Sequence, residues 1–180
     1  MVMRIELEKL QGGKGGFAHV YQPEELNPVD ERVRVTQPAE VKGNVNQAGH
    51  EVFVSGHVET RAQLECDRCL QLVELPVSAD FALEYITGSD YESSSAAVLS
   101  EEELAVSVFD GESIDVDEIV KEQILLAVPA RTLCREECKG ICPECGTDLN
   151  ARQCNCADEE VDPRWAALQS FKNTDNPNTE

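Results

Sequence analysis

The sequence feature that most constrains the fold is a set of eight cysteines that falls into four closely spaced pairs. The pairs are Cys66/Cys69, Cys134/Cys138, Cys142/Cys145 and Cys154/Cys156. In a chain of cytosolic character such pairs favour metal binding over disulfides. A tight turn between two cysteines directs both sulfurs toward one ion, at ~2.3 Å in the case of Zn²⁺. Eight such ligands make two tetrahedral sites.

The spacing suggests how the cysteines are divided between the two sites. The segment Cys142-Pro-Glu-Cys145, followed by Gly146, has the form of a zinc knuckle, and Cys154/Cys156 is the pair within easy reach of it. Cys66/Cys69 and Cys134/Cys138 are then left for the other site. One metal would join a hairpin tip to the end of a helix, and the other would fold a short ribbon. Other partitions stay open at this stage.

Four thiolates around one ion indicate a structural site, because no coordination position stays open for water or substrate. The sequence therefore predicts two structural Zn²⁺ ions. An iron–sulfur cluster is one alternative, and a metal-free redox dithiol at Cys66-Asp-Arg-Cys69 is another. The redox alternative is weaker, because such motifs place the first cysteine at a helix N-terminus, whereas this pair follows a predicted strand.

Alternating apolar and polar residues indicate β-strands on both sides of the first cysteine pair. Apolar side chains fall mostly at even positions over residues 51–65 and at odd positions over residues 73–85. A period of two over this length is typical of strands with one polar face. The first cysteine pair then lies at or near a hairpin tip. Pro76, on the polar face, indicates a sheet edge or a bulge.

A helical period follows the strands. Apolar residues over 116–128 recur at intervals of three and four, Asp115 has the position of an N-cap, and Pro129 ends the pattern. A second, short helix is expected to begin at Asp162-Pro163 and to bury Trp165.

These patterns together predict an α+β fold. Its parts are an antiparallel β meander or partly closed barrel, one capped helix, and a C-terminal cysteine-rich zinc ribbon that ends in a short helix. The predicted β-rich domain spans residues 1–130 and includes an acidic loop (88–103) and a helix (115–128). The cysteine-rich zinc-binding region and C-terminal helix span residues 131–172, and a disordered tail spans residues 173–180.

The charge of the chain excludes a broad RNA-binding face. Fifteen Lys and Arg stand against 35 Asp and Glu, a net charge of −20, and eight thiolates with two Zn²⁺ would change it by −8 and +4, to −24. Such a chain repels a phosphate polyanion. A local RNA or partner contact could still form near the cysteines, where five basic residues cluster in sequence: Arg68, Arg131, Arg135, Lys139 and Arg152. Their alternative role is to offset the thiolate charge.

The sequence lacks the marks of a membrane protein and of an enzyme. It has no run of ~18 apolar residues, and acids stand where a secretion signal needs an apolar core, so we expect a cytoplasmic protein. The three histidines lack the spacing of a zinc hydrolase, and Gly12-Gly-Lys-Gly-Gly16 is not followed by the Gly-Lys-Ser/Thr of a phosphate loop. We expect no enzymatic activity and no small-molecule substrate.

The compound motif in the second half resembles a known family, the bacterial YceD-type large ribosomal RNA subunit accumulation proteins. The resemblance spans roughly residues 1–171 and is weak before residue 50. It rests on Cys66-Asp-Arg-Cys-Leu70, Gly111-Glu-Ser-Ile-Asp115, the helix end Glu122–Pro129, the run Cys134–Gly146, Asp148-Leu-Asn150, Cys154-Asn-Cys156 and Asp162-Pro-Arg-Trp165. The resemblance implies a role in accumulation or processing of large-subunit (23S) ribosomal RNA, hence in ribosome assembly, and implies no catalytic activity.

Three functions are consistent with these observations. The first is an assembly factor whose acidic surface holds a basic ribosomal protein or a large-subunit precursor, partly imitating RNA. The second is a zinc-ribbon module that binds RNA directly through the basic residues near the cysteines. The third is a thiol–disulfide oxidoreductase that uses a metal-free Cys66/Cys69 pair.

Overall fold

A computed structural model describes residues 3–88, 106–156 and 164 of the chain. The chain divides into two units, Met1–Cys138 and Lys139–Glu180. The predicted acidic loop lies almost wholly outside the described residues, and so do the predicted C-terminal tail and, apart from Arg164, the predicted C-terminal helix. The division at residue 130 remains a prediction.

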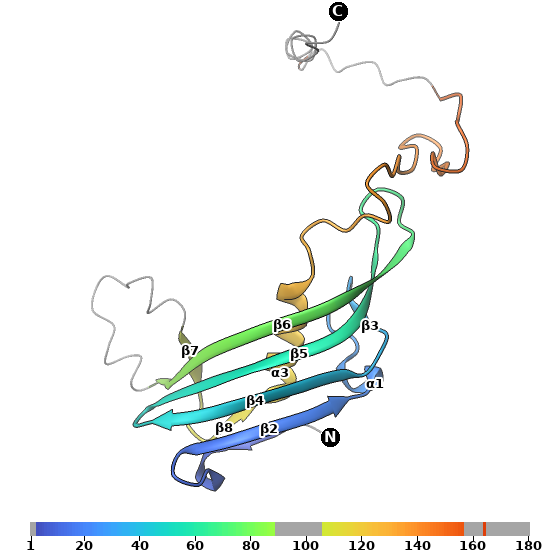
Figure 1. Ribbon diagram of the computed structural model, residues 1–180. Coiled ribbons are helices and arrows are strands. Elements are labelled where there is room, and N and C mark those ends of the chain that lie inside the picture. The colour runs from blue at the N-terminus through green and yellow to red at the C-terminus, as the bar shows by residue number, and fades with distance from the viewer. Residues whose placement is uncertain (1–2, 89–105, 157–163, 165–180) are drawn as a thin grey trace, which may run out of the picture. The chain divides into compact units, whose positions relative to one another are not determined.

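The first unit consists mainly of β-strands (Figure 1). In chain order its elements are β1 (Arg4–Glu6), η1 (Leu7–Lys9), β2 (Lys14–Tyr21), α1 (Pro23–Leu26), β3 (Arg34–Val35), β4 (Ala39–Ala48), β5 (Glu51–Glu65), β6 (Leu72–Thr87), β7 (Val106–Phe109), β8 (Ser113–Asp115) and α3 (Val116–Ala127). The main sheet has the strand order β2-β4-β5-β6-β7, and β3 also pairs with β5. Strands β1 and β8 form a separate two-stranded sheet.

The central hairpin follows the alternation in the sequence. Strands β5 and β6 pair antiparallel from Val52↔Tyr85 to Glu65↔Leu72. Even positions of β5 and odd positions of β6 therefore share the buried face, on which Val58 is fully buried and Phe81 is 6% exposed. The prediction of a mostly β chain with few helices is confirmed.

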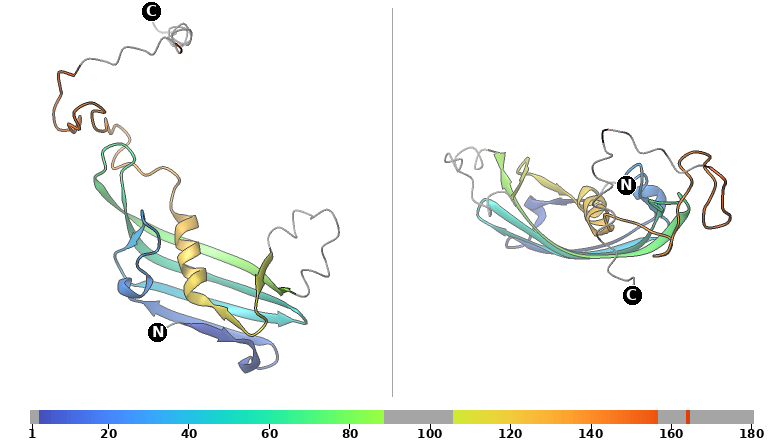
Figure 2. Two further views of the ribbon diagram at one scale, coloured as in Figure 1. Left: turned by 180° about the vertical axis from the view of Figure 1, so that it is seen from behind. Right: turned by 90° about the horizontal axis from the view of Figure 1, so that it is seen from above.

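Two features of the predicted meander are corrected by the structure. The sheet is open rather than closed into a barrel, because the strands at its ends, β2 and β7, do not pair with each other. Strand β7 also pairs with β6 in parallel rather than antiparallel. Figure 2 shows that the open sheet curves around α3, so the helix rather than a second wall of strands covers the concave face.

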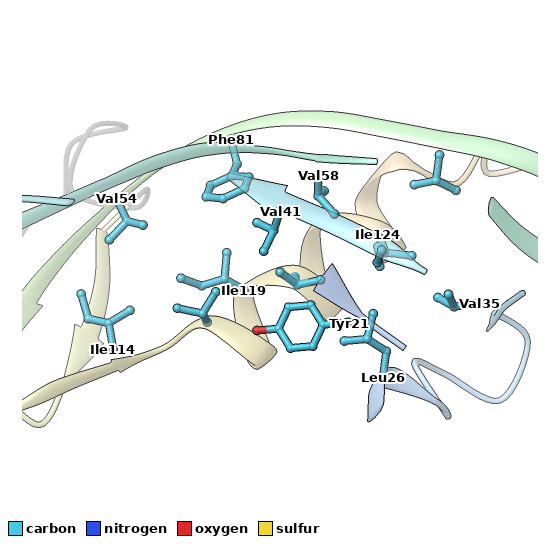
Figure 3. Close-up of a cluster of buried hydrophobic side chains, with 14 of the residues drawn as sticks. Tyr21, Leu26, Val35, Val41, Val54, Val58, Phe81, Ile114, Ile119 and Ile124 are labelled. Carbon is cyan, nitrogen blue, oxygen red and sulfur yellow. The ribbon is translucent and has the colours of Figure 1, made fainter. Parts of the chain in front are cut away.

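Helix α3 supplies the other half of the core. The Asp115 carboxylate accepts a hydrogen bond from the Glu118 backbone N–H at 3.2 Å, so the helix is N-capped as its sequence indicated. Ile119 and Ile124 are buried between the helix and the sheet, in the same cluster as Val41 (Figure 3). Fully burying such a side chain stabilises the fold by ~1.5–3 kcal/mol.

Two glycines in the middle of the sheet make room for aromatic rings. Phe17 lies opposite Gly43, Gly43 opposite Gly56, and Gly56 opposite Phe81, in one row across four strands. A Cβ added to Gly56 would lie 2.6 Å from Cζ of Phe81, and one added to Gly43 would collide with the ring of Phe17. The missing side chains therefore allow the rings to pack flat on the core face.

Pro76 lies at an edge, as its place on the polar face suggested. The Arg61 carbonyl accepts from Thr36 N–H at 2.9 Å, on the β3 side of β5. Arg61 pairs with Pro76, so the backbone polar groups of both residues point away from the β5–β6 interface. The side of β6 that faces away from β5 pairs with β7 only from Glu84 onward. Pro76, which has no N–H to donate, therefore lies in the stretch of that side where β7 does not pair.

None of the helices in the described part of the chain has the length and apolar composition that crossing a membrane requires.

Candidate metal centres

The eight cysteine sulfurs gather into two groups of four. Site 1 consists of Cys66, Cys69, Cys134 and Cys138, and site 2 consists of Cys142, Cys145, Cys154 and Cys156. Within each group the four Sγ atoms all lie within 4.8 Å of one another. These are the groups that the spacing of the cysteines suggested, and each lies within one of the two units.

The geometry of site 1 fits a tetrahedral zinc centre. The Sγ atoms of Cys66 and Cys138 are 3.9 Å apart, and those of Cys69 and Cys134 are 3.6 Å apart. Four sulfurs ~2.3 Å from a central Zn²⁺ are ~3.8 Å apart at tetrahedral angles, whereas disulfide sulfurs are ~2.05 Å apart. All eight cysteines are free thiols. Both sites could therefore bind a metal ion, and the donor set suits Zn²⁺.

The first cysteine pairs of the two sites sit in the same backbone turn. In site 1, Leu70 N–H donates to the Cys66 carbonyl and Cys66 N–H donates to the Gln71 carbonyl, at 2.9 and 2.8 Å. In site 2, Gly146 N–H donates to the Cys142 carbonyl and Cys142 N–H donates to the Thr147 carbonyl, both at 2.9 Å. The two turns therefore present their sulfurs in the same way.

This turn requires a left-handed residue directly after the second cysteine. Gly146 meets the requirement with φ of 67°, at no steric cost. Leu70 holds the equivalent position with φ of 60°, the only non-glycine residue with positive φ among those described. A leucine there is strained, by roughly 1–2 kcal/mol. Its side chain is also 56% exposed, so packing of that side chain does little to offset the strain.

Asp67, between the first two cysteines, ties the hairpin tip to the chain that follows α3. Its backbone N–H donates to the Thr132 carbonyl at 2.9 Å, and its Oδ2 accepts from Thr132 N–H at 2.6 Å. Its Oδ1 accepts from the Arg32 guanidinium at 2.9 Å. This role of Asp67 could not be predicted from the sequence, because nothing in the spacing of a single carboxylate indicates a partner 65 positions away.

Arg68 makes a second connection of the same kind. Its Nη1 donates to the carbonyl of Cys138 at 2.6 Å and to that of Glu136 at 3.3 Å. The two residues between Cys66 and Cys69 thus both bind the segment that carries Cys134 and Cys138. This guanidinium was predicted as an RNA or partner contact, and the structure places it on the backbone of the second cysteine pair.

Site 1 is shielded from solvent, and its thiols differ in acidity. Cys66 is 0% and Cys138 is 2% exposed. Burial acts to raise the pKa of Cys66, but backbone N–H groups, chiefly that of Arg68, outweigh burial and lower the pKa to about 6. Burial, followed by hydrogen bonds with the neighbouring thiols, raises the pKa of Cys134 to about 12. All four ligands become thiolates together only when a cation balances their charge.

Site 2 is more open. Cys142 is buried, Cys154 is half-buried, and Cys145 and Cys156 are exposed. Hydrogen bonds with the hydroxyl and backbone of Thr147 lower the pKa of Cys145 to about 6, and the Sγ–Oγ1 distance is 3.2 Å.

The remaining part of site 2 is held by polar contacts rather than by a core. Lys139 N–H donates to the Asn150 side chain at 2.8 Å, and Asn150 N–H and Nδ2 donate to Asp148 at 2.9 and 2.8 Å. Leu149 N–H donates to the Gly140 carbonyl at 2.9 Å. The segment Asp148-Leu-Asn150, singled out in the sequence motif, therefore closes the loop around the knuckle.

The other predicted basic contacts lie on the surface. Arg131 and Arg135 are exposed on either side of the start of the Cys134/Cys138 segment, and neither makes an ion pair with another described residue. Lys139 and Arg152 are exposed in the second unit. A joint contact surface formed by these residues stays a prediction.

Comparison with known proteins agrees with the cysteine motifs. The family model "Large ribosomal RNA subunit accumulation protein YceD" matches residues 54–172. An uncharacterized protein of Mycobacterium leprae is 30% identical over 146 residues, which cover 79% of this chain and 63% of that protein. The uncharacterized protein YlbN of Bacillus subtilis is 27% identical over 162 residues, 88% of either chain.

A more distant relative carries the family description in its name. The chloroplastic large ribosomal RNA subunit accumulation protein YCED homolog 1 of Arabidopsis thaliana is 32% identical over 59 residues, 33% of this chain and 18% of that protein. The mycobacterial relatives are matched over 57–63% of their own length. No solved structure matches the chain. Because the family model covers well over half of the chain, including all eight cysteines, the chain belongs to the YceD family of large ribosomal RNA subunit accumulation proteins.

Proposed function

We propose that the chain is a cytoplasmic ribosome biogenesis factor that supports accumulation of large-subunit ribosomal RNA and catalyses no reaction. The observation that carries the proposal is the pair of four-cysteine sites in a member of this family. Four thiolates fill every position of a tetrahedral ion, so a bound Zn²⁺ would organise the chain and leave no place for a substrate.

Each metal would have a distinct structural task. At site 1 it would join the β5–β6 hairpin tip to the segment after α3, across the contacts of Asp67 and Arg68 described above. At site 2 it would organise residues 139–156, which contain no helix or strand and only one isolated β-bridge, Ile141↔Asp148. A segment of this size cannot form its own hydrophobic core and depends on the metal to fold.

The charge of the chain favours a basic protein as the direct partner. On the polar face of the main sheet the side chains of Asp80, Glu59 and Glu40 are 91%, 67% and 60% exposed. Such a surface attracts a lysine- and arginine-rich ribosomal protein and repels bare RNA. The protein would thereby hold a ribosomal protein, or a precursor particle that presents one, until it is incorporated.

Sedimentation of cell lysates tests this proposal. We expect the wild-type chain to sediment with large-subunit precursors or with a ribosomal protein. The triple charge reversal E40K/E59K/D80K should release it to the top of the gradient. A control with the same net charge, E8K/E31K/E112K, changes exposed acids elsewhere and should sediment like the wild type. A wild-type chain found only free, or a triple variant that still co-sediments, would contradict the proposal.

Direct binding of RNA is the second candidate. It is favoured by the exposed Arg131 and Arg135, which make no ion pair within the described residues. Ultraviolet crosslinking of the R135E/K139E variant tests it, since loss of the RNA signal would support the RNA-binding candidate and an unchanged signal would exclude it.

The oxidoreductase candidate is the weakest of the three. A redox dithiol must reach its substrate, yet Cys66 is 0% and Cys69 only 7% exposed. Elemental analysis of the purified chain decides the matter: two tightly held Zn²⁺ per chain exclude a free Cys66/Cys69 dithiol, whereas a metal-free pair that cycles between thiol and disulfide would overturn the structural-zinc proposal.

A further inference from the structure

We propose that two copies of the chain form a two-fold dimer through β2, which pairs antiparallel with β2 of the second copy and makes the two main sheets continuous. This inference is independent of the proposed function. It rests on the backbone groups that β2 leaves open, on the contrast with β6, and on the distribution of charge along β2.

One side of β2 is paired and the other side is open. The Gly13 carbonyl accepts from Gln47 N–H at 2.7 Å, so odd-numbered residues of this segment direct their backbone groups toward β4. The even residues Gly16, Ala18 and Val20 direct theirs to the opposite side. Among the described strands, β4 is the only one that pairs with β2. Six strong hydrogen-bonding groups thus line an open edge.

The open stretch has definite ends. Lys14 N–H donates to the Gln11 carbonyl at 3.4 Å. At the other end Gln22 N–H donates to the Glu25 carboxylate at 2.7 Å, and the Gln22 carbonyl accepts from Glu25 N–H at 2.9 Å, in the cap of α1. Between these ends lie Gly16, Ala18 and Val20, whose open N–H and carbonyl groups have no backbone partner among the described residues.

The open edge of β6 is protected against pairing with another chain, whereas the open edge of β2 is not. On β6 the missing N–H of Pro76 faces the open side, and the charged residues Glu74 and Asp80 flank it on the same face. Proline and charge are the usual means by which an edge strand avoids pairing with another chain. From Gly15 to Tyr21 the β2 sequence has neither proline nor a carboxylate, lysine or arginine. The β2 edge therefore remains competent for pairing.

One register pairs the open groups of all three residues. If Ala18 lies opposite Ala18 of the partner subunit, Gly16 lies opposite Val20 of the partner subunit. Each of the three N–H groups then meets a carbonyl of the other copy, in both directions. The same register places the side chain of Val20, 49% exposed in the single chain, over the glycine and removes apolar surface from water.

Charge favours the antiparallel arrangement. Lys14 is the only Lys or Arg on β2, and β2 has no Asp or Glu; Glu24 and Glu25 follow its other end at the surface. Antiparallel pairing places Lys14 opposite Gln22 of the partner subunit, next to those two carboxylates. Parallel pairing would place lysine beside lysine and acid beside acid. The two-fold arrangement thus brings unlike charges together at both ends of the interface.

The mass of the zinc-loaded full chain in solution tests the proposal. Sedimentation equilibrium from about 1 to about 100 µM should show a transition from the 19.8 kDa monomer to twice that mass. In the A18K variant like charges meet at the two-fold axis, and we expect the dimer dissociation constant to rise at least tenfold. The matched control S78K places the same exposed lysine on the open side of β6 and should dimerise as the wild type does.

Amide hydrogen exchange locates the interface independently of any variant. Exchange at Gly16, Ala18 and Val20 should slow as the protein concentration rises, while Phe17 and His19 are protected at every concentration by β4. Ser78, on the open side of β6, should stay unprotected. A wild type that remains a monomer, an A18K variant that dimerises equally well, or protection of β2 only in the presence of another protein would overturn the self-pairing.

Discussion

Removing the Asp67 carboxylate should destabilise the first unit and weaken site 1 together. The carboxylate accepts a hydrogen bond of 2.6 Å from the backbone N–H of Thr132, which is 4% exposed. A hydrogen bond to a charged group contributes ~1.5–3 kcal/mol, and the exposed contact with Arg32, at 2.9 Å, adds ~0.2–1 kcal/mol. For Asp67→Ala we therefore expect a loss of ~2–3 kcal/mol in the free energy of unfolding.

Two further variants separate the contributions. Asp67→Asn keeps an acceptor oxygen for Thr132 and should lose only ~1 kcal/mol. Arg32→Ala removes the exposed ion pair alone and should lose no more than ~1 kcal/mol. Denaturant unfolding of the zinc-loaded chain measures all three values.

The same variants should also change zinc affinity at one site only. Asp67 orients the turn that carries Cys66 and Cys69, and loss of such a supporting contact typically lowers metal affinity ~10–100-fold. Titration with a competing chelator should show one of two zinc ions weakened in Asp67→Ala and the other unchanged. An unfolding free energy within ~0.5 kcal/mol of the wild type, or equal weakening of both ions, would refute the proposed role of the carboxylate.

Three further predictions concern the sheet, the second site and pH. Gly56→Ala should cost ~1–3 kcal/mol in thermal unfolding, because its Cβ would lie 2.6 Å from an aromatic ring and from a carbonyl oxygen, whereas Gly16→Ala, with nothing nearer than 3.7 Å, serves as a tolerated control. A chelator should remove zinc from site 2 before site 1, since two site 2 cysteines are exposed; release in the opposite order, followed with a zinc-sensitive dye, would contradict the assignment. Hydrogen bonds with the carboxylates of Glu59 and Asp80 raise the pKa of His57, so its stabilising contribution is present below the unfolded-state pKa and is lost as pH rises through the higher folded-state pKa. The effect is small because the side chain is 39% exposed, and a proton NMR titration together with a flatter stability–pH profile in His57→Gln would check it.

The structural features that could be predicted from the sequence are those that depend on residues close together in the chain. Alternation over 51–65 and 73–85 depends on which neighbours face the same side, and the structure has β5 and β6 there. The cap at Asp115 likewise depends on contacts within one helical turn. The closure of the sheet could not be foreseen in the same way, because it depends on whether β2 and β7 meet, and these strands are far apart in the chain.

The cysteines show the same division between local and long-range information. Spacing was enough to suggest the two groups of four, since each pair is a local turn and the last pair follows the knuckle after eight residues, within easy reach of it. Spacing could not show that Leu70 occupies the position that Gly146 fills in the second turn. That equivalence is a matter of backbone hydrogen bonds and φ, and a leucine in the left-handed region is disfavoured by its own sterics.

By itself, the sequence determined the two strand-forming segments beside the first cysteine pair, the capped helix and the four cysteine pairs, because each is encoded by residues close together in the chain. The order and spacing of these motifs were enough to indicate the family. Only the tertiary structure decided that the described strands form an open sheet around α3, and that none of them pairs with the outer edge of β2. It also decided that Asp67 and Arg68 bind the segment after the helix. The physical reason is that these contacts join residues more than 60 positions apart, and their hydrogen-bonding groups find each other only after the strands have paired and the helix has packed on them.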